Sequence, residues 1–152
     1  MHPNPLITLG SLGQSPWYDF ITRDLVTSGE LARLIAEDGL RGMTTNPTIF
    51  EKAIATSELY DEDIRTLTAE GKWPTEVFEA LAVADVRAAC DLFLPIHRTS
   101  GGIDGLVSIE VSPALARDTA GTIEQAERLW ARIGRPNVMI KIPGTPEGLP
   151  AI

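Results

Sequence analysis

The stretch LVSIEVS, from Leu106 to Ser112, decides the fold because its polar and apolar residues alternate. Successive side chains of a β-strand point to opposite faces of the sheet. In a strand predicted over residues 103–112, Ser108 and Glu110 therefore share one face, and the apolar residues between them share the other. Such a strand has one face that helices can cover and a second face that carries polar groups.

Three other stretches repeat this pattern and are predicted as strands over residues 16–21, 40–45 and 137–142. The residues expected on the same face as Glu110 are Asp19, Thr44, Asn46, Asn137, Met139 and Lys141. Helices are predicted between the strands over residues 27–39, 46–54, 57–71, 75–97 and 122–134. This alternation of strand and helix implies parallel strands joined by helical crossovers.

Local signals predict where several helices begin. Thr27 and Glu30 have the spacing of a capping box. Thr122 and Gln125 repeat that spacing before a later helix. Asn46 precedes a proline, so it is expected to cap a helix whose first residue is that proline.

An apolar outer face under helices, with a polar inner face near the carboxyl ends of the strands, is typical of a (β/α)8 or TIM barrel. We therefore predict an α/β protein that forms the N-terminal half of such a barrel, with about four parallel strands. A doubly wound sheet is the alternative, but no glycine-rich phosphate loop follows the first strand. Since a full barrel needs roughly 250 residues, we expect an N-terminal arm over residues 1–15 and a partial barrel over residues 16–152, truncated after the fourth strand.

The composition argues against several classes of protein. The 152 residues carry a net charge of −8 without a basic cluster, which argues against binding to nucleic acid or to an anionic membrane. No apolar run approaches the roughly 20 residues of a membrane span, and the first residues do not resemble a signal peptide. Cys90 lies in a helical pattern and is expected to be buried. No residue spacing suggests a metal site, and we expect a cytoplasmic protein.

Lys141 lies in the apolar run VMIKI, where a lysine is unusual. One interpretation is that its stem packs on apolar neighbours while its ammonium reaches water. The other follows from its place on the inner face, where desolvation disfavours the ammonium and leaves more free amine to attack a carbonyl. Such an amine forms a Schiff base, and the iminium stabilises the carbanion that remains when an adjacent C–C bond breaks.

Glu110 and Asp19 are carboxylates on the same predicted face as Lys141. Either could be a structural ion-pair partner of the lysine. Alternatively, they transfer the protons that imine formation and C–C cleavage require. Asn46 can cap a helix with its side-chain oxygen and donate its amide N–H groups to a substrate hydroxyl.

Three motifs together resemble the transaldolase family: GMTTNPTIFEKAI from Gly42, LVSIEVSP from Leu106 and PNVMIKIPGTPEGLPAI from Pro136. The opening SLGQSPWYDFITRDLVTSGELARLIAEDGLRG, from Ser11, is similar to the longer bacterial form of this family, which is also found fused to phosphoglucose isomerase. The resemblance implies a (β/α)8-barrel enzyme of the pentose phosphate pathway. It would move a dihydroxyacetone unit between sugar phosphates without a metal or organic cofactor. The sugar phosphates implied are sedoheptulose 7-phosphate, fructose 6-phosphate, glyceraldehyde 3-phosphate and erythrose 4-phosphate.

The resemblance also implies roles for five residues. Lys141 matches the Schiff-base lysine, which this family carries on its fourth strand. Asp19 matches the aspartate that shuttles the hydroxyl proton at the cleaved bond, and Glu110 matches the glutamate that acts through a water during imine formation. Asn46 matches the asparagine that holds a substrate hydroxyl, and Thr44, on the same face, is a further substrate-binding candidate. The family's phosphate-binding arginines come from later strands, so the chain is expected to be a fragment.

Two alternative functions remain open at this point. The first is a different Schiff-base aldolase, which cleaves fructose 6-phosphate without transfer to an acceptor aldehyde. The second is an inactive half-barrel that associates with a partner chain through its open sheet edge, where unpaired backbone groups favour association.

Overall fold

The computed structural model describes residues 4–152 and places one four-stranded sheet in this part of the chain. Its strands are β1 (Trp17–Asp19), β2 (Gly42–Thr44), β3 (Leu106–Glu110) and β4 (Val138–Lys141). They lie in the order β1-β2-β3-β4, and each neighbouring pair is parallel. This order lacks the reversal that defines a doubly wound sheet. It confirms the predicted α/β pattern of a partial TIM barrel.

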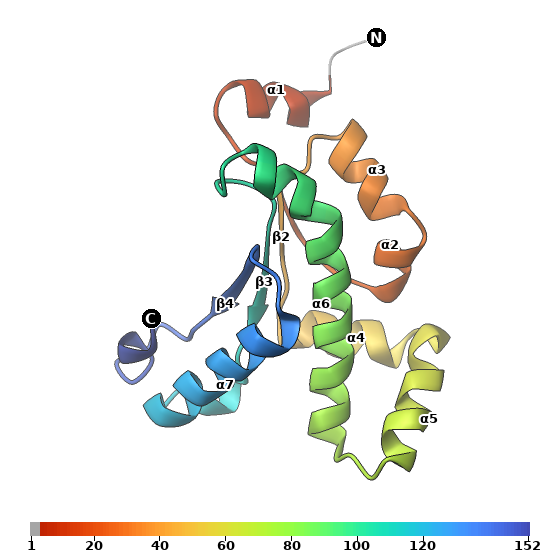
Figure 1. The fold of residues 1–152 in the computed structure, drawn as a ribbon, viewed down its shortest axis with the longest axis vertical. Helices are drawn as coiled ribbons and strands as arrows, with labels where there is room; N and C mark the ends of the chain where they lie inside the picture. The colour runs from red at the N-terminus through yellow and green to blue at the C-terminus, as the bar shows by residue number, and fades with distance from the viewer. Residues whose placement is uncertain (1–3) are drawn as a thin grey trace.

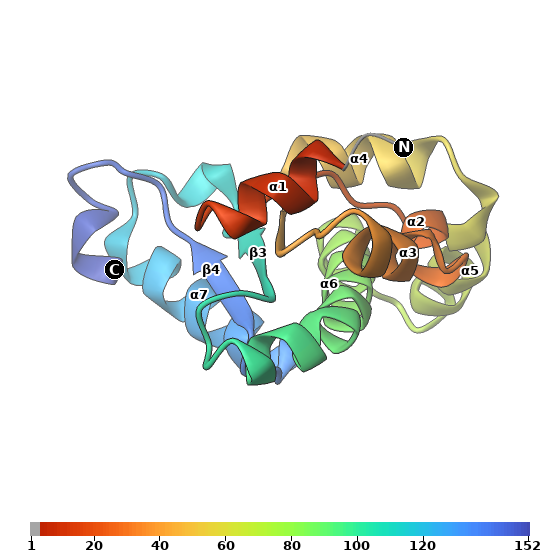
Figure 2. The same ribbon diagram turned by 90° about the horizontal axis from the view of Figure 1, so that it is seen from above.

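Helices form the outer layer of the molecule. The α-helices of the described residues are α1 (Pro5–Ser11), α2 (Arg23–Thr27), α3 (Glu30–Glu37), α4 (Pro47–Ala55), α5 (Asp61–Ala69), α6 (Pro74–Thr99) and α7 (Thr119–Ile133). Short 3-10 helices are η1 (Glu58–Tyr60), η2 (Pro113–Leu115) and η3 (Leu149–Ala151). Figure 1 shows the long helix α6 running beside the strands, and Figure 2 shows α3, α6 and α7 in an arc round one side of the sheet. No helix within residues 4–152 combines the length and the apolar character needed to cross a bilayer.

The segment expected as an N-terminal arm contains helix α1, and its residues 1–3 lie outside the described part of the chain. Two hydrogen bonds tie this segment to loops that precede strands. The Asn4 side chain donates to the carboxylate of Asp38 (2.6 Å), just before β2, and the Ser15 hydroxyl donates to Asp104 (2.5 Å), just before β3. Helix α1 therefore lies at the amino-terminal end of the strands, as Figure 1 shows.

The outer face of the sheet and the helices share the main hydrophobic core. Met43, Val107 and Val138 are register partners on this face, and their exposed fractions are 0%, 0% and 3%. Phe93 from α6 and Ile133 from α7 are fully buried in the same cluster. The apolar half of the alternating pattern thus lies under helices in β2, β3 and β4, as the sequence predicts. In the first predicted strand, Tyr18 and Phe20 are 38% and 40% exposed, so the prediction that helices cover them is wrong.

The inner face of the sheet is more open to solvent. Trp17 and Met139 on this face are 40% and 45% exposed. Asn137 is an exception to the predicted alternation, because it precedes β4 and is completely buried. Its side-chain amide donates to the backbone carbonyls of Cys90 (2.9 Å) and Gly105 (2.8 Å), so it joins α6 to the loop before β3. The prediction that Asn137 shares a face with the polar strand residues is therefore wrong.

The first predicted capping box, at Thr27 and Glu30, is wrong. A short helix that the sequence pattern did not predict, α2, comes first, and its cap is Thr22, whose hydroxyl accepts from the amide of Leu25 (3.1 Å). Helix α3 then begins after Gly29, which has a φ of 91°. Glycine suits this position because other residues rarely adopt positive φ.

The second predicted capping box, at Thr122 and Gln125, is also wrong. Helix α7 begins at Thr119, because the Asp118 carboxylate caps it by accepting from the amide of Gly121 (3.0 Å). Thr122 is instead buried and does not cap this helix. A capping-box spacing is only a local signal, and here tertiary contacts use the same side chains differently.

Candidate active site

The site is built at the carboxyl ends of β3 and β4. Glu110 and Lys141 are the last residues of these strands and are direct register partners. Because they occupy the same face, the Lys141 Nζ lies 3.3 Å from Glu110 Oε2. The structure therefore brings together the predicted Schiff-base lysine and one of the two predicted proton-transfer carboxylates.

Thr44 at the end of β2 completes the contact. Its Oγ1 accepts a hydrogen bond from Lys141 Nζ at 3.2 Å. The hydroxyl of Ser108, which is its register partner in β3, donates to the same oxygen at 3.0 Å. Three neighbouring strands thus position the lysine amine between a carboxylate and a pair of hydroxyls.

Sequence reasoning placed Ser108 on the inner face but gave it no role. The structure shows that Ser108 is only 3% exposed and holds the hydroxyl that contacts Lys141. The signal was present in the sequence, because Ser108 stands two residues before Glu110 and shares its face.

Asp19 and Asn46 flank this group without contacting the lysine directly in the described contacts. Asp19 ends β1, is exposed, and pairs in register with Thr44. Asn46 follows β2 and caps α4, because its Oδ1 accepts from the amide of Ile49 at 3.0 Å and Pro47 is the first helical residue. The predicted cap is confirmed. Its side-chain NH2 group makes no hydrogen bond within residues 4–152 and remains available as a donor.

The lysine is more solvated than the sequence interpretation expected. Its side chain is 37% exposed, and that of Glu110 is 30% exposed. The four described strands cover the site on one side only, so the inner face faces solvent. The arrangement nevertheless has the parts for carbonyl chemistry, since an amine, a carboxylate and hydroxyls meet within hydrogen-bonding reach.

The other groups that could take part in chemistry lie elsewhere. Cys90 is completely buried, as predicted, and burial raises the pKa of its thiol to about 12. A thiol with that pKa stays protonated and is a poor nucleophile near neutral pH. Within residues 4–152, no three His, Cys, Asp or Glu side chains are grouped so that they could hold a metal ion.

Comparison with known proteins adds an independent finding. A family model described as Transaldolase/Fructose-6-phosphate aldolase matches residues 16–152. The chain is 49% identical over all its 152 residues to a transaldolase of Trichodesmium erythraeum, of which it covers 40%. It is 51% identical over 140 residues, or 92% of its length, to a transaldolase of Thiobacillus denitrificans, of which it covers 39%. The chain therefore spans about two fifths of the length of these curated relatives.

Proposed function

Since this chain belongs to the transaldolase/fructose-6-phosphate aldolase family, we propose that Lys141 forms a Schiff base with the ketone of a sugar substrate. The observation that carries the proposal is the contact of its Nζ with Glu110 at 3.3 Å and with Thr44 at 3.2 Å. The reaction would be that of a transaldolase, which moves a dihydroxyacetone unit between sugar phosphates in the pentose phosphate pathway.

The first proposed step joins the amine to the substrate. Neutral Lys141 attacks the ketone carbon, and the carbinolamine then loses water to give the iminium. The attached amine must lose one proton and the leaving hydroxyl must gain one, and the Glu110 carboxyl is near enough to Lys141 to carry these protons directly or through a water. Glu110 is thus assigned to proton transfer in imine formation and hydrolysis.

The second proposed step breaks a C–C bond. A base takes the proton of the hydroxyl next to that bond, the aldehyde product leaves, and the iminium accepts the electron pair to become an enamine. We assign the base to Asp19, whose strand lies on the far side of Thr44 from β3. The enamine then adds to the acceptor aldehyde, and water releases the new ketose from Lys141.

Substrate placement is assigned to Asn46 and Thr44. The free amide donor of Asn46 and the hydroxyl of Thr44 lie at the end of β2 and suit the hydroxyl groups of dihydroxyacetone. We propose that the complete transfer of the dihydroxyacetone unit between sugar phosphates requires a protein as long as the transaldolase relatives. The formation of the imine is assigned to residues of this chain.

The test is to trap the imine. The chain has three lysines, Lys52, Lys72 and Lys141, so two of them serve as internal controls. Incubation with dihydroxyacetone and borohydride avoids any need for phosphate-binding residues and should leave a reduced adduct at Lys141, mapped by peptide mass spectrometry. A second arm with fructose 6-phosphate should label the same residue. Equal labelling of all three lysines, or none at Lys141, would contradict the proposal.

A fructose 6-phosphate aldolase is the second candidate, because the description of the matching family names both activities. Both enzymes would form the same adduct at Lys141, so trapping does not separate them. Product analysis with a protein of the relatives' length does. An aldolase releases free dihydroxyacetone without an acceptor, whereas a transaldolase needs erythrose 4-phosphate or glyceraldehyde 3-phosphate to turn over.

A further inference from the structure

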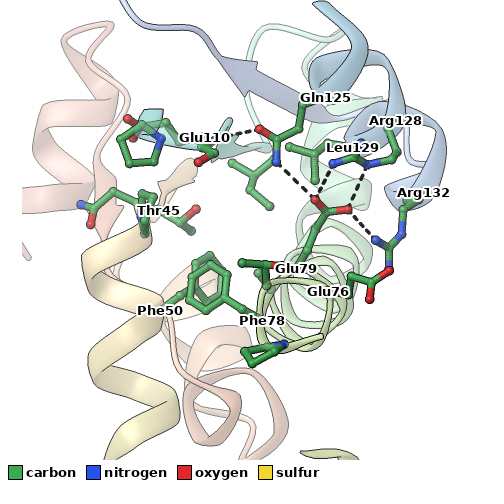
Figure 3. Close-up of a pocket in the computed structure, with 18 of the residues that line it drawn as sticks. Thr45, Phe50, Glu76, Phe78, Glu79, Glu110, Gln125, Arg128, Leu129 and Arg132 are labelled. Carbon is green, nitrogen blue, oxygen red and sulfur yellow. Dashed lines mark hydrogen bonds and ion pairs between the residues drawn. The ribbon is translucent and has the colours of Figure 1, made fainter. Parts of the chain in front are cut away.

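A cleft of about 810 Å³ opens in the helical layer, on the outer side of the strands. It lies between α4, α6 and α7, next to the carboxyl ends of β2 and β3 (Figure 3). Its lining includes Phe50, Phe78, Glu79, Arg128, Leu129 and Arg132. A cleft of this size falls in the range of small-molecule binding sites, which run from roughly 300 to 1,000 Å³.

One wall of the cleft carries a fixed group of charges. Glu79 on α6 accepts hydrogen bonds from Arg128 at 2.9 and 3.2 Å and from Arg132 at 2.5 Å. Gln125 donates to the same carboxylate at 3.2 Å and accepts from the amide of Ser112 at 2.7 Å. Figure 3 shows Glu79 enclosed by these three side chains of α7.

These hydrogen bonds hold Arg128 and Arg132 in place but leave some of their N–H donors free. Their side chains are 46% and 40% exposed, whereas the side chain of Glu79 is 15% exposed. Two guanidinium groups share one carboxylate, so this group of three side chains keeps one net positive charge. The rest of the lining adds one cation, Lys72, and two carboxylates, Glu76 and Glu110. Each guanidinium has five N–H donors, and within residues 4–152 Arg128 and Arg132 use fewer than that to bind Glu79. Because Glu79 already fixes the side chains of Arg128 and Arg132, these side chains would lose less conformational entropy when a ligand binds to them.

The lining next to this charged group is aromatic and apolar. Phe50 and Phe78 pack edge to face, with ring centroids 6.3 Å apart and planes at 83°. Leu129 is 2% exposed and packed in the core, whereas Phe78 is half-buried, so its ring remains accessible from the cleft. Flat apolar groups pack well against such rings.

We propose that this cleft binds a small organic anion whose acidic group lies on Arg128 and Arg132 and whose flat apolar body packs against Phe78. A phosphate and a carboxylate share the chemistry that the two guanidinium groups recognise. One end of the cleft adjoins the proposed catalytic group, because Glu110 and Asn46 also line it, whereas Lys141 does not. The proposed anion site is the other part of the cleft, formed by side chains of α6 and α7. The proposal does not depend on the Schiff-base assignment.

The test uses the full chain and three probes of similar size: phenyl phosphate, benzoate and benzyl alcohol. Each is titrated at constant ionic strength while backbone amide signals are followed by NMR. We expect at least one anion to shift the signals of Phe78, Gln125 and Leu129 with saturation, and the uncharged alcohol to bind at least about tenfold more weakly, since hydrogen bonds to charged groups are the stronger ones. The anion that binds tighter identifies the acidic group.

Variants decide whether the binding uses this site. Arg128→Gln and Phe78→Leu should each weaken binding of the anion about tenfold, whereas Arg98→Gln, at the exposed end of α6, should not. The amide spectrum of each variant shows directly whether it is folded. The proposal is overturned if no anion saturates the cleft signals, if benzyl alcohol binds equally well, or if folded Arg128→Gln and Phe78→Leu bind as the unchanged chain does.

Discussion

At the scale of single residues, the site depends on which side of a strand each side chain occupies. Lys141, Glu110 and Thr44 come from three strands, yet their polar atoms lie within 3.3 Å of the lysine nitrogen. Parallel pairing in register produces this convergence, because Glu110 faces Lys141 directly. The same pairing places the two hydroxyls beside the lysine, since Ser108 is the register partner of Thr44 and donates a hydrogen bond to it.

Replacing the carboxylate tests the role assigned to Glu110. Glu110→Gln keeps the size of the side chain but removes its capacity to carry protons, so we expect borohydride trapping of dihydroxyacetone at Lys141 to slow by about 10²-fold. The ion pair is about one third exposed, so folding stability should change by less than about 1 kcal/mol. Trapping rates by mass spectrometry and urea unfolding give the two numbers.

A matched control for Glu110→Gln is Glu51→Gln, which alters an exposed carboxylate on α4. This variant should trap dihydroxyacetone at the unchanged rate. If Glu110→Gln also traps at the unchanged rate, Glu110 is a structural ion-pair partner of Lys141 and not a proton carrier.

At the scale of elements, the sequence predicted strands better than helix starts. The period of two correctly assigned the faces of β3. Val107 and Ile109 lie in the core under the helices, whereas Ser108 and Glu110 make the polar contacts of the inner face. Helix starts failed where a side chain had a competing use. Thr27 donates its hydroxyl to the carbonyl of Arg23 inside α2, and Gln125 accepts from the amide of Ser112. Only the tertiary structure reveals such competing partners.

The start of α4 allows capping to be separated from substrate binding. Asn46→Ala removes the side-chain acceptor for the amide of Ile49, and we expect it to lower the free energy of unfolding by about 1 kcal/mol. Asn46→Asp keeps an acceptor of similar capping strength but removes the amide donor. It should therefore unfold like the unchanged chain while forming less adduct with dihydroxyacetone. Equal adduct yields for Asn46→Asp and the unchanged chain would remove Asn46 from the substrate site.

The tie between α6 and α7 should make stability depend on pH. Burial acts to raise the pKa of Glu79, but hydrogen bonds from Arg128, Gln125 and Arg132 outweigh it, and the pKa lies below its ordinary value of 4.5. A carboxyl group with a lowered pKa in the folded state stabilises the fold above its unfolded pKa and loses that contribution as the pH falls through its folded pKa. Glu79→Gln should therefore lose less stability than the unchanged chain on acidification from about pH 5 downward.

Urea unfolding at several pH values measures this difference. Glu127→Gln on α7 is the matched control, because Glu127 is exposed and forms no ion pair within the described residues. Its unfolding should follow the pH dependence of the unchanged chain. Parallel pH curves for Glu79→Gln and the unchanged chain would show that the arginine contacts do not stabilise the fold.

At the scale of the whole molecule, the order and direction of the strands could be predicted, but the helical cleft could not. The parallel direction followed from the alternation of strands and helices, and the strand order followed from the barrel pattern of a polar inner face and an apolar outer face. The cleft depends on the contact between Glu79 and Arg128, which stands 49 positions later in the chain. No local sequence pattern predicts that contact. The same limit explains Asn137, whose partners Cys90 and Gly105 lie 47 and 32 positions away.

The open inner face predicts that the molecules associate with one another. Trp17 on β1 and Met139 on β4 are 40% and 45% exposed, and these strands are the two edges of the described sheet. Exposed apolar groups beside unpaired strand edges favour association. In sedimentation velocity, the average mass should rise above 16.5 kDa as the concentration increases.

Met139→Lys should shift the chain toward monomer because a charge in that contact is costly to bury. Leu12→Lys, which changes a 72% exposed residue beyond α1, should leave association unchanged. A chain that stays monomeric at all concentrations, or an equal effect of both variants, would show that the inner face is not a contact surface.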